Sequence, residues 1–352
     1  MQILESQWLG AVAIGRNEGE RLRGCLTSLA GRVRQVVYVD SGSTDASAEL
    51  ARSLGAEVVE LDSSSPFTAA RARNAGVERL KAIAPDVAYV QFVDGDCELR
   101  PSWPDRARRE LEADAKLAAV CGRRRERFPE RSIYNRLMDL EWDTPIGPAK
   151  SVGGDAMFRL EAFESAGGFD ASLMAGEEPQ LCMRLRHSQW RLLRVDAEMT
   201  LHDAAMTRFG QWWRRQVRGG YGAMDVYRRF EVGGERLFGK PTRSATMWAV
   251  GWPAAVIAAG LMGRAIGPSA AGWVAAMLVF LAMPLQMARL SARAMARGVG
   301  PRTALAYGAM TMLGKWAWFW GQIQYRRGQA RGERLQLIEY KQAASKSAGA
   351  AR

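Results

Sequence analysis

The chain has 352 residues, enough for two domains, and its formal net charge is +12. Such a basic chain favours anionic partners, namely nucleic acid, an acidic membrane surface or a phosphorylated substrate. No zinc-ligand spacing, RNA-binding signature or basic DNA-reading helix occurs in the sequence, so we expect no nucleic-acid partner. The four cysteines are widely spaced and form no CxxC pair, which is typical of a reducing compartment.

The first part of the chain alternates between strand and helix patterns. Apolar runs predict buried strands at residues 8–14, 35–39, 57–61 and 88–93. Helical spacing between these runs predicts helices near residues 22–29, at 46–54 and around Arg71 to Asn74. This alternation predicts a parallel sheet with right-handed crossovers, and we expect phosphates to bind where its strands end and its helices begin.

The strand at 88–93 is followed by Asp94-Gly95-Asp96. Two carboxylates separated by a glycine can hold a divalent cation and leave ligand positions open for phosphate oxygens. Asp-Gly is also a common turn dipeptide, and the triplet taken alone favours a turn. Three further motifs along the chain favour the metal site instead.

Four short motifs follow the predicted strands in order. They are Ala11–Glu18, Val39–Asp45, Ala72–Gly76 and Val93–Asp96. Together they resemble the four successive signatures of family 2 glycosyltransferases, and this resemblance covers residues 9 to about 215. It implies a GT-A fold, which is an α/β, Rossmann-like catalytic domain with a mostly parallel sheet.

The resemblance also implies roles for individual side chains. Asp40 would recognise the nucleotide base, Arg73 would lie near the base or the diphosphate, and Asp94 would touch the ribose. The nucleotide-binding residues implied in this way are Asn17, Glu18, Asp40, Arg73 and Asp94. Asp96 would ligate Mg²⁺ or Mn²⁺, with Asp94 as a second ligand.

The segment Gly176–Leu185 resembles the part of the family in which an acidic residue at a helix start acts as catalytic base. Glu178 falls on the base position, and the adjacent Glu177 is the alternative. An inverting transfer needs one carboxylate to take the acceptor hydroxyl proton while a metal stabilises the departing diphosphate. A helix start that favours acidic residues through its dipole also accounts for both glutamates.

Other residues are assigned by weaker similarities. The family sometimes supplies a third metal ligand from a histidine after the base segment, and His202 stands there, although a packed or surface histidine is the alternative. Asp155 lies in Ser151–Arg159, which resembles the strand beneath the acceptor. Gln211 and Arg214 belong to a partial QxxRW signature and are expected near acceptor or diphosphate.

The stretch that contains Gln211 and Arg214 also suits an interfacial helix, because it combines aromatic and apolar residues with several arginines. In the QxxRW pattern of processive members, Arg215 replaces the final tryptophan, so we do not expect processive synthesis.

A separate charge run, Arg123–Arg127, follows a predicted strand at 117–122. We interpret it as a solvated face, with steering of an anionic donor or lipid as the alternative.

Two uncharged apolar stretches, residues 246–262 and 270–288, are each close to the ~20 residues that a membrane-spanning helix needs. Buried helices of a soluble domain are the alternative. The link between them carries only Arg264, whereas the link after them is rich in arginine, so the hairpin is expected to return to the cytoplasm. A third stretch, 304–323, contains Lys315 and is expected to be interfacial or re-entrant.

We therefore predict four regions: a GT-A domain at 1–204, an amphipathic interfacial region at 205–243, a membrane segment at 244–325 and a basic cytoplasmic tail at 326–352. The predicted function is inverting transfer of a sugar from a nucleotide-sugar donor, with UDP favoured, to a membrane-associated acceptor such as a lipid-linked glycan in surface polysaccharide synthesis. The catalytic domain would face the cytoplasm at the bacterial inner membrane. The alternatives are direct glycosylation of a lipid or polyprenyl phosphate, and a catalytically silent scaffold or sugar-nucleotide sensor.

Overall fold

The computed structural model describes residues 7–265 and 270–332, which divide into two compact units. The first unit lies within Met1–Pro129, Met138–Ala205 and Phe230–Leu237. The second lies within Glu130–Leu137, Met206–Arg229 and Phe238–Arg352.

The first unit is built on a mixed sheet, which has nine strands within the described residues. The strands are β1 (Leu9–Gly15), β2 (Gln35–Asp40), β3 (Glu57–Glu60), β4 (Tyr89–Asp94), β5 (Cys97–Leu99), β6 (Leu117–Glu126), β7 (Gly147–Pro148), β8 (Met157–Arg159) and β9 (Arg191–His202). They lie in the order β3-β2-β1-β4-β8-β6-β9-β5, with β7 paired to β9. The first four strands pair in parallel, as the sequence predicts. Strand β8 is antiparallel to both neighbours.

Helices cover this sheet with their apolar faces. They are α1 (Glu20–Leu29), α2 (Ser47–Ser53), α3 (Ala69–Ile83), α4 (Trp103–Ala113), α6 (Leu160–Ser165) and α7 (Glu177–His187). The short η1 (Pro129–Arg131) and α5 (Ile133–Glu141) follow β6 in the chain, and residues 130–137 belong to the second unit. In α1 the buried positions are Leu22, Cys25, Leu26 and Leu29, the helical spacing that the sequence predicts. All four cysteines are free and buried.

The strand order places a crevice between the ends of β1 and β4. From β1 the chain moves outward through β2 to β3, and it then returns to add β4 on the other side of β1. Loops that leave the carboxyl ends of β1 and β4 therefore diverge, and ligands of open α/β sheets bind at such a point. Asn17 follows β1, and Asp94 ends β4 beside Asp96.

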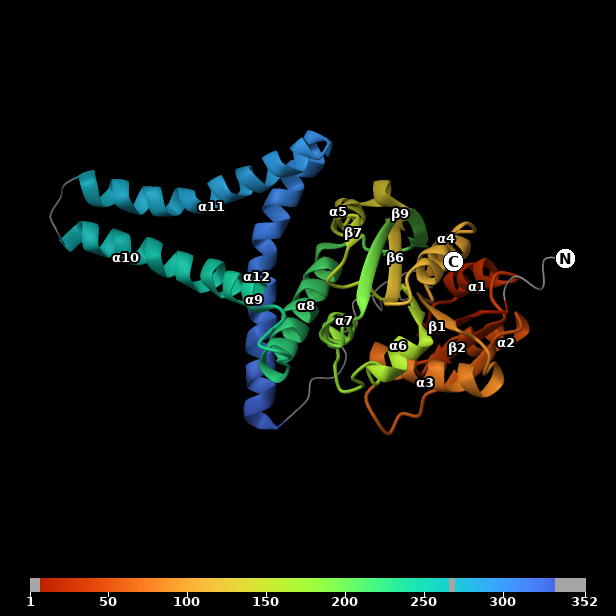
Figure 1. Cartoon of the computed structure of the whole chain (residues 1–352). Helices are drawn as coiled ribbons and strands as arrows, with labels where there is room; N and C mark the ends of the chain where they lie inside the picture. Colours follow the sequence, from red (N-terminus) through yellow and green to blue (C-terminus); the bar gives the residue numbers. More distant parts are fainter. Residues whose placement is uncertain (1–6, 266–269, 333–352) are drawn as a thin grey trace, which may run out of the picture. The chain divides into compact units, whose positions relative to one another are not determined.

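The second unit is helical. It contains α8 (Phe209–Arg229), α9 (Gly239–Thr246), the π-helical turn η2 (Met247–Gly251), α10 (Trp252–Ala265), α11 (Ala270–Ala296) and α12 (Pro301–Arg331). Helices α10 and α11 run side by side, and both meet the long α12 at their inner ends (Figure 1). Helix α12 packs closely on α8, because a Cβ atom at Gly321 would lie 2.2 Å from the carbonyl oxygen of Val217.

Two helices of this unit are long and apolar enough to cross a membrane, Gly239–Ala265 and Trp273–Ala296. The first contains the predicted stretch 246–262, the second overlaps the predicted stretch 270–288 from Trp273 onward, and only 11% of each apolar window is buried. Helix α12 runs without a break from Pro301 to Arg331 and contains residues 304–323. The interfacial or re-entrant placement of this stretch stays a prediction, and the predicted tail lies outside the described residues from position 333 onward.

Candidate active site

The carboxylate of Asp96 and the imidazole of His202 meet at the end of the sheet. Strand β5 pairs antiparallel with β9 in a register that sets Cys97 opposite His202. As a result, Oδ2 of Asp96 lies 3.4 Å from Nε2 of His202, and their side chains are 1% and 7% exposed. The ring of Trp142 packs edge-on against the imidazole, with centroids 4.6 Å apart. The structure thus brings together two residues that are 106 positions apart and that the sequence predicts as metal ligands.

This donor set fits a hard divalent cation. Ligand atoms of Asp96, Cys97 and His202 all lie within 4.8 Å of one another. Burial, with the nearby Asp155 carboxylate, raises the pKa of the Cys97 thiol well above its ordinary value, so the thiol is protonated at neutral pH. Of the remaining donors, the carboxylate suits both Mg²⁺ and Mn²⁺, whereas the imidazole suits a transition metal such as Mn²⁺ better than Mg²⁺. Nδ1 of His202 is buried without a hydrogen-bond partner and lies 3.6 Å from Oε2 of Glu126.

Asp94 lies between two buried arginines. Its Oδ1 is 2.8 Å from Nη2 of Arg73 on α3, and its Oδ2 is 3.3 Å from Nη2 of Arg124 on β6. Burial alone would lower the pKa of Arg73, but the carboxylates of Asp94 and Glu177 outweigh burial and raise this pKa. Gly154 makes room for the guanidinium, because a Cβ atom there would lie 2.5 Å from Arg73 Nη2. Both arginines therefore remain charged beside the carboxylate.

The charge run after residue 122 is not a solvated face throughout, so that interpretation is wrong for part of it. Strand β6 continues to Glu126, and Arg124 lies 2.6 Å from Oδ1 of Asp155. The Arg123 side chain is 12% exposed and pairs with Asp139 at 3.2 Å. A buried carboxylate such as Asp155 needs a cation, and Arg124 turns inward to meet this need.

The carboxylate of Asp155 is engaged by other groups of the protein. Its Oδ1 accepts the backbone N–H of Asp94 at 3.3 Å, and its Oδ2 accepts the hydroxyl of Thr200 at 2.9 Å. With Arg124 on Oδ1 as well, both oxygens are engaged. Asp155 therefore braces the end of β4, and its predicted contact with acceptor or diphosphate stays a prediction.

The predicted nucleotide-binding residues Asn17, Glu18 and Asp40 lie at two loops joined by hydrogen bonds. The side-chain oxygen of Asn17 accepts the N–H of Thr44 at 2.7 Å, and the N–H of Asn17 donates to the Ser43 hydroxyl at 2.9 Å. Asn17 has φ of 56°, a left-handed conformation that asparagine tolerates better than most residues. The buried Asp40 carboxylate accepts the Ser43 N–H at 2.7 Å. Glu18 pairs with Arg21 at 3.0 Å.

The two candidate bases occupy different surroundings at the start of α7. Oε1 of Glu177 lies 2.8 Å from Nη1 of Arg73, which links it to Asp94. Oε1 of Glu178 accepts the N–H of Val152 at 2.7 Å and the thiol of Cys182 at 3.0 Å. Burial raises the pKa of Glu178, and these hydrogen bonds oppose the rise only in part. Glu178 therefore has the property of a general base that works nearer neutral pH.

Gln211 and Arg214 belong to the second unit. The side-chain oxygen of Gln211 accepts the N–H groups of Thr207 at 2.9 Å and Arg208 at 3.0 Å, which satisfies two donors at the start of α8. Arg214 is exposed on α8. Their predicted contacts with acceptor or diphosphate stay predictions.

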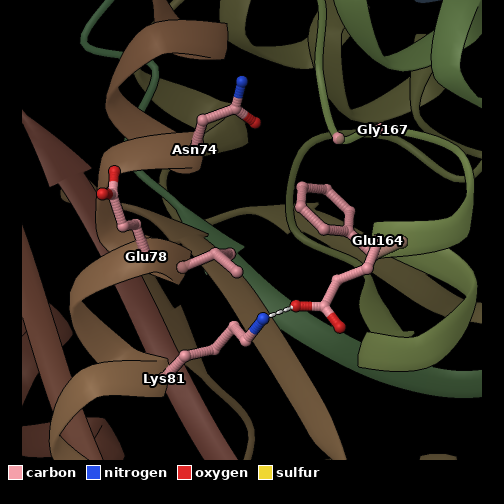
Figure 2. A pocket seen from close by; sticks show the side chains of 8 residues that line it. Asn74, Glu78, Lys81, Glu164 and Gly167 are labelled. Atoms are coloured by element: carbon pink, nitrogen blue, oxygen red, sulfur yellow. Dashed lines mark ion pairs between the residues drawn. The ribbon is translucent and has the colours of Figure 1, made fainter.

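A separate pocket of about 490 Å³ lies along α3 and α6. Figure 2 shows Lys81 paired with Glu164 at its edge, and Asn74 and Glu78 on the α3 side. Its lining residues are Asn74, Val77, Glu78, Lys81, Phe163, Glu164, Gly167 and Gly168. None of them is a predicted metal, base or nucleotide residue, so this pocket is distinct from the candidate active site.

Comparison with known proteins agrees with this geometry. The sequence model of the family described as glycosyl transferase family 2 matches residues 13–163, a segment that contains β1 to β4 and the Asp94–Asp96 turn. The chain carries a family 2 glycosyltransferase domain. Over 186 residues it is 28% identical to the succinoglycan biosynthesis protein ExoA of Rhizobium meliloti (strain 1021). That match covers 50% of this chain and spans only 55% of the relative's length.

Solved structures give the fold of this glycosyltransferase domain. A mannosyltransferase from Pyrobaculum calidifontis, in complex with GDP-Man and Mn²⁺, superposes with a TM-score of 0.50 at 18% identity, covering 92% of this chain and 86% of that one. TarS of S. aureus gives a TM-score of 0.47 at 13% identity, covering 91% of this chain and 92% of that one. The mannosyltransferase match and the mostly parallel sheet give a fold of the GT-A type, as the sequence resemblance implies.

Sequence reasoning missed three residues of the glycosyltransferase site. Arg124 pairs with Asp94 and Asp155, Glu126 faces His202, and Trp142 covers the imidazole. The only signal in the sequence was the position of Arg124 and Glu126 two residues apart on one extended segment, which puts them on the same side of a regular strand. No signal indicated Trp142, because its contact with His202 joins segments 60 residues apart.

Proposed function

We propose that this protein transfers one sugar, with inversion, from a nucleotide-sugar donor to an acceptor held at a membrane. The observation that carries the proposal is the buried Asp96–His202 pair, 3.4 Å apart, at the strand-end crevice of a family 2 glycosyltransferase domain. Ligands of open α/β sheets bind at the carboxyl ends of the strands, which supports a diphosphate site beside this pair.

Asp96, His202 and Asp94 would hold Mg²⁺ or Mn²⁺. A divalent cation bound there would supply positive charge for the diphosphate that departs from the sugar. Asp94 is held by Arg73 at 2.8 Å and by Arg124 at 3.3 Å, and both arginines stay charged. The guanidinium groups of Arg73 and Arg124 would lie beside this cation site, where they would pair with diphosphate oxygens. The nucleoside would lie toward Asn17, Glu18 and Asp40.

Glu178 is the base in this proposal. Its carboxylate would take the proton from the acceptor hydroxyl as that oxygen attacks the anomeric carbon and the bond to the diphosphate breaks. The raised pKa of Glu178, caused by burial, makes its carboxylate a stronger base than an exposed glutamate. Glu177 orients Arg73 through a 2.8 Å ion pair. The two glutamates thus have different proposed roles because their contacts differ.

The proposal that the acceptor is held at a membrane rests on the second unit. Large apolar side chains of α10 and α11 are exposed, for example Leu261 at 65%, Trp273 at 70% and Leu285 at 65%. Such a surface needs a membrane or a partner around it. The arginines after α11 indicate that the hairpin returns to the cytoplasmic side, so the donor site would face the nucleotide-sugar pool. We therefore propose an inner-membrane enzyme that acts on a lipid-linked or membrane-associated acceptor, as in polysaccharide synthesis.

The experiment is a transfer assay. Membranes that contain the full chain are incubated with Mn²⁺ and radiolabelled UDP-, GDP- or dTDP-sugars, and the label in the organic extract is measured. Asp96→Ala and Glu178→Gln should each abolish the label. Mild acid then separates the products, because a glycan on a lipid diphosphate is released whereas an uncharged glycolipid is not. If both variants keep the wild-type cellular phenotype and product, the scaffold alternative replaces this proposal.

A further inference from the structure

Residues 236–332 contain twelve lysine and arginine residues and no aspartate or glutamate. Most of these cations lie near helix ends, as in Arg243 of α9 and Arg326 of α12. Lys315 differs, because it is the only charged residue from position 303 to position 325. It lies near the middle of α12, where the surrounding sequence is apolar and aromatic.

The position of Lys315 on α12 follows from its register. Gly308, Lys315 and Gln322 are spaced by seven residues, which is close to two helical turns, so they share one face at intervals of ~10.5 Å. At Gly308 this face touches α11, since a Cβ atom there would lie 2.4 Å from the carbonyl oxygen of Met287. At Gln322 it touches α9, where Nε2 donates to the carbonyl oxygen of Thr242 at 3.1 Å. Lys315 therefore lies between the two contacts.

Aromatic side chains of α10 and α12 meet beside Lys315. The indole of Trp252 donates to the carbonyl oxygen of Val279 at 2.9 Å, which joins α10 to α11, and its ring meets Trp316 of α12 edge-on with centroids 6.4 Å apart. The residue next to Lys315 thus packs against the first residue of α10.

Lys315 has no ionic partner of its own. It is partly buried, and residues 7–265 and 270–332 provide neither an ion pair nor a hydrogen bond to its ammonium group. A cation in apolar surroundings costs free energy unless an anion pairs with it, and such residues in membrane segments mark ligand sites. Helices α9 to α12 contain no acidic residue among the described positions, so an anion that pairs with Lys315 has to come from outside these four helices.

We propose that Lys315 binds the phosphate group of a long-chain lipid, and that this lipid is the carrier of the sugar acceptor. The apolar surfaces of α10 and α11 would contact the hydrocarbon chain, while the ammonium group of Lys315 would pair with the phosphate. A structural phospholipid offers the same phosphate chemistry, so the experiment must separate the two sources. The inference deepens the proposed function and rests on it for the membrane-held acceptor.

The test measures lipid binding without any donor, by native mass spectrometry of the full chain in detergent. The probes are polyprenyl phosphate, the uncharged polyprenol and phosphatidylglycerol. The variants are Lys315→Met, which removes only the charge, Lys315→Gln as a second neutral variant, and Lys315→Arg, which keeps the charge. Arg264→Met is the matched control, because it removes an exposed cation at the end of α10.

We expect polyprenyl phosphate to bind at least tenfold more tightly than polyprenol or phosphatidylglycerol. Lys315→Met and Lys315→Gln should lose this preference, whereas Lys315→Arg and Arg264→Met should keep it. Equal binding of polyprenol, or wild-type binding by both neutral variants, would overturn the site. Equal binding of phosphatidylglycerol would overturn its assignment to the acceptor carrier.

Donor binding on the same samples separates this inference from the proposed function. Mn²⁺-dependent binding of a nucleotide should be unchanged in every Lys315 variant, because Lys315 does not belong to the donor site. If donor binding persists and the lipid preference is absent, only the Lys315 site fails. If donor binding is absent in the wild type, the proposed function itself fails.

Discussion

Arg124 and Asp155 form a buried ion pair, with Nη2 of Arg124 2.6 Å from Oδ1 of Asp155. The Asp155 side chain is fully buried, and it also receives the backbone N–H of Asp94. This pair therefore connects the centre of the sheet to the end of β4, where the predicted metal ligands lie. Its loss should disturb both the stability of the fold and the position of Asp94.

Replacement of Arg124 by methionine should lower the stability of the fold. A buried carboxylate that loses its cationic partner typically costs about 3 to 5 kcal/mol. We expect a clear drop in the thermal unfolding midpoint of the full chain in detergent. Arg125→Met is the control, because the Arg125 side chain is 46% exposed, and its change should stay within about 0.5 kcal/mol. Equal effects of the two substitutions would contradict the role given to Arg124.

Glu178→Gln should have opposite effects on activity and stability. Loss of a general base typically lowers the rate about 10²- to 10⁴-fold. Burial raises the pKa of Glu178 above its ordinary value of 4.5, so the ionised form is disfavoured in the folded protein. Its contribution to stability is therefore complete below pH 4.5 and is lost as pH rises through the raised pKa. Glutamine cannot ionise, so the variant should be more stable than wild type at neutral pH.

The pH dependence of the rate checks the same assignment. In wild type, the transfer rate should increase with pH through a pKa above 4.5, because only the carboxylate can accept the proton. Glu177→Gln is the comparison. It should weaken nucleotide binding through Arg73 but keep this acid limb. If Glu177→Gln removes the limb and Glu178→Gln keeps it, the roles of the two glutamates are reversed.

Glu126→Gln should weaken metal binding although Glu126 is not a ligand. The Glu126 carboxylate faces Nδ1 of His202 at 3.6 Å and also accepts the N–H of Ala204 at 3.1 Å. Carboxylates that orient a metal-bound histidine typically contribute 10- to 100-fold in affinity. Titration of Mn²⁺ by electron paramagnetic resonance should show about a tenfold loss. The control is Glu98→Gln on β5, the strand that pairs with β9. An equal loss of Mn²⁺ affinity in Glu98→Gln would argue against a specific role of Glu126.

Gly321→Ala should separate α8 from α12. The new Cβ atom would lie 2.2 Å from the carbonyl oxygen of Val217 and 2.6 Å from the N–H nitrogen of Tyr221. Overpacking of this kind typically costs about 1 to 3 kcal/mol. Gly260→Ala in α10 meets nothing within 4 Å and serves as the matched control. Thermal unfolding of the two variants in the same detergent should differ clearly, and equal midpoints would mean that α8 and α12 are not in contact.

The sequence predicted β1 to β4 to within one or two residues, because buried parallel strands are continuous apolar runs and each ends in a polar motif. It did not predict that Arg124 turns inward. The register between β6 and β9 shifts between Cys121 and Arg123 and again between Arg123 and Arg124. Such irregularities change which side of the strand each residue faces, and no local pattern reveals them.

Contacts between residues far apart in the sequence were the second feature that the sequence did not predict. The motif placed Asp96 at a strand end, but its meeting with His202 depends on the register of β5 with β9. In the same way, the burial of Glu178 depends on Val152, which is 26 residues away. Residue type and spacing indicated which side chains are candidates, whereas the different surroundings of Glu177 and Glu178 are properties of the folded chain.

The most direct test of the central claim is calorimetry of the full chain in detergent with UDP, GDP and dTDP, each with and without Mn²⁺. The protein is compared with Asp96→Ala and with Asp105→Ala, which changes an exposed aspartate in the first turn of α4. We predict that one nucleotide binds only when Mn²⁺ is present, that Asp96→Ala loses this binding, and that Asp105→Ala keeps it. Binding of none of the three nucleotides, or equal Mn²⁺-dependent binding by Asp96→Ala, would contradict a metal-dependent donor site at Asp96.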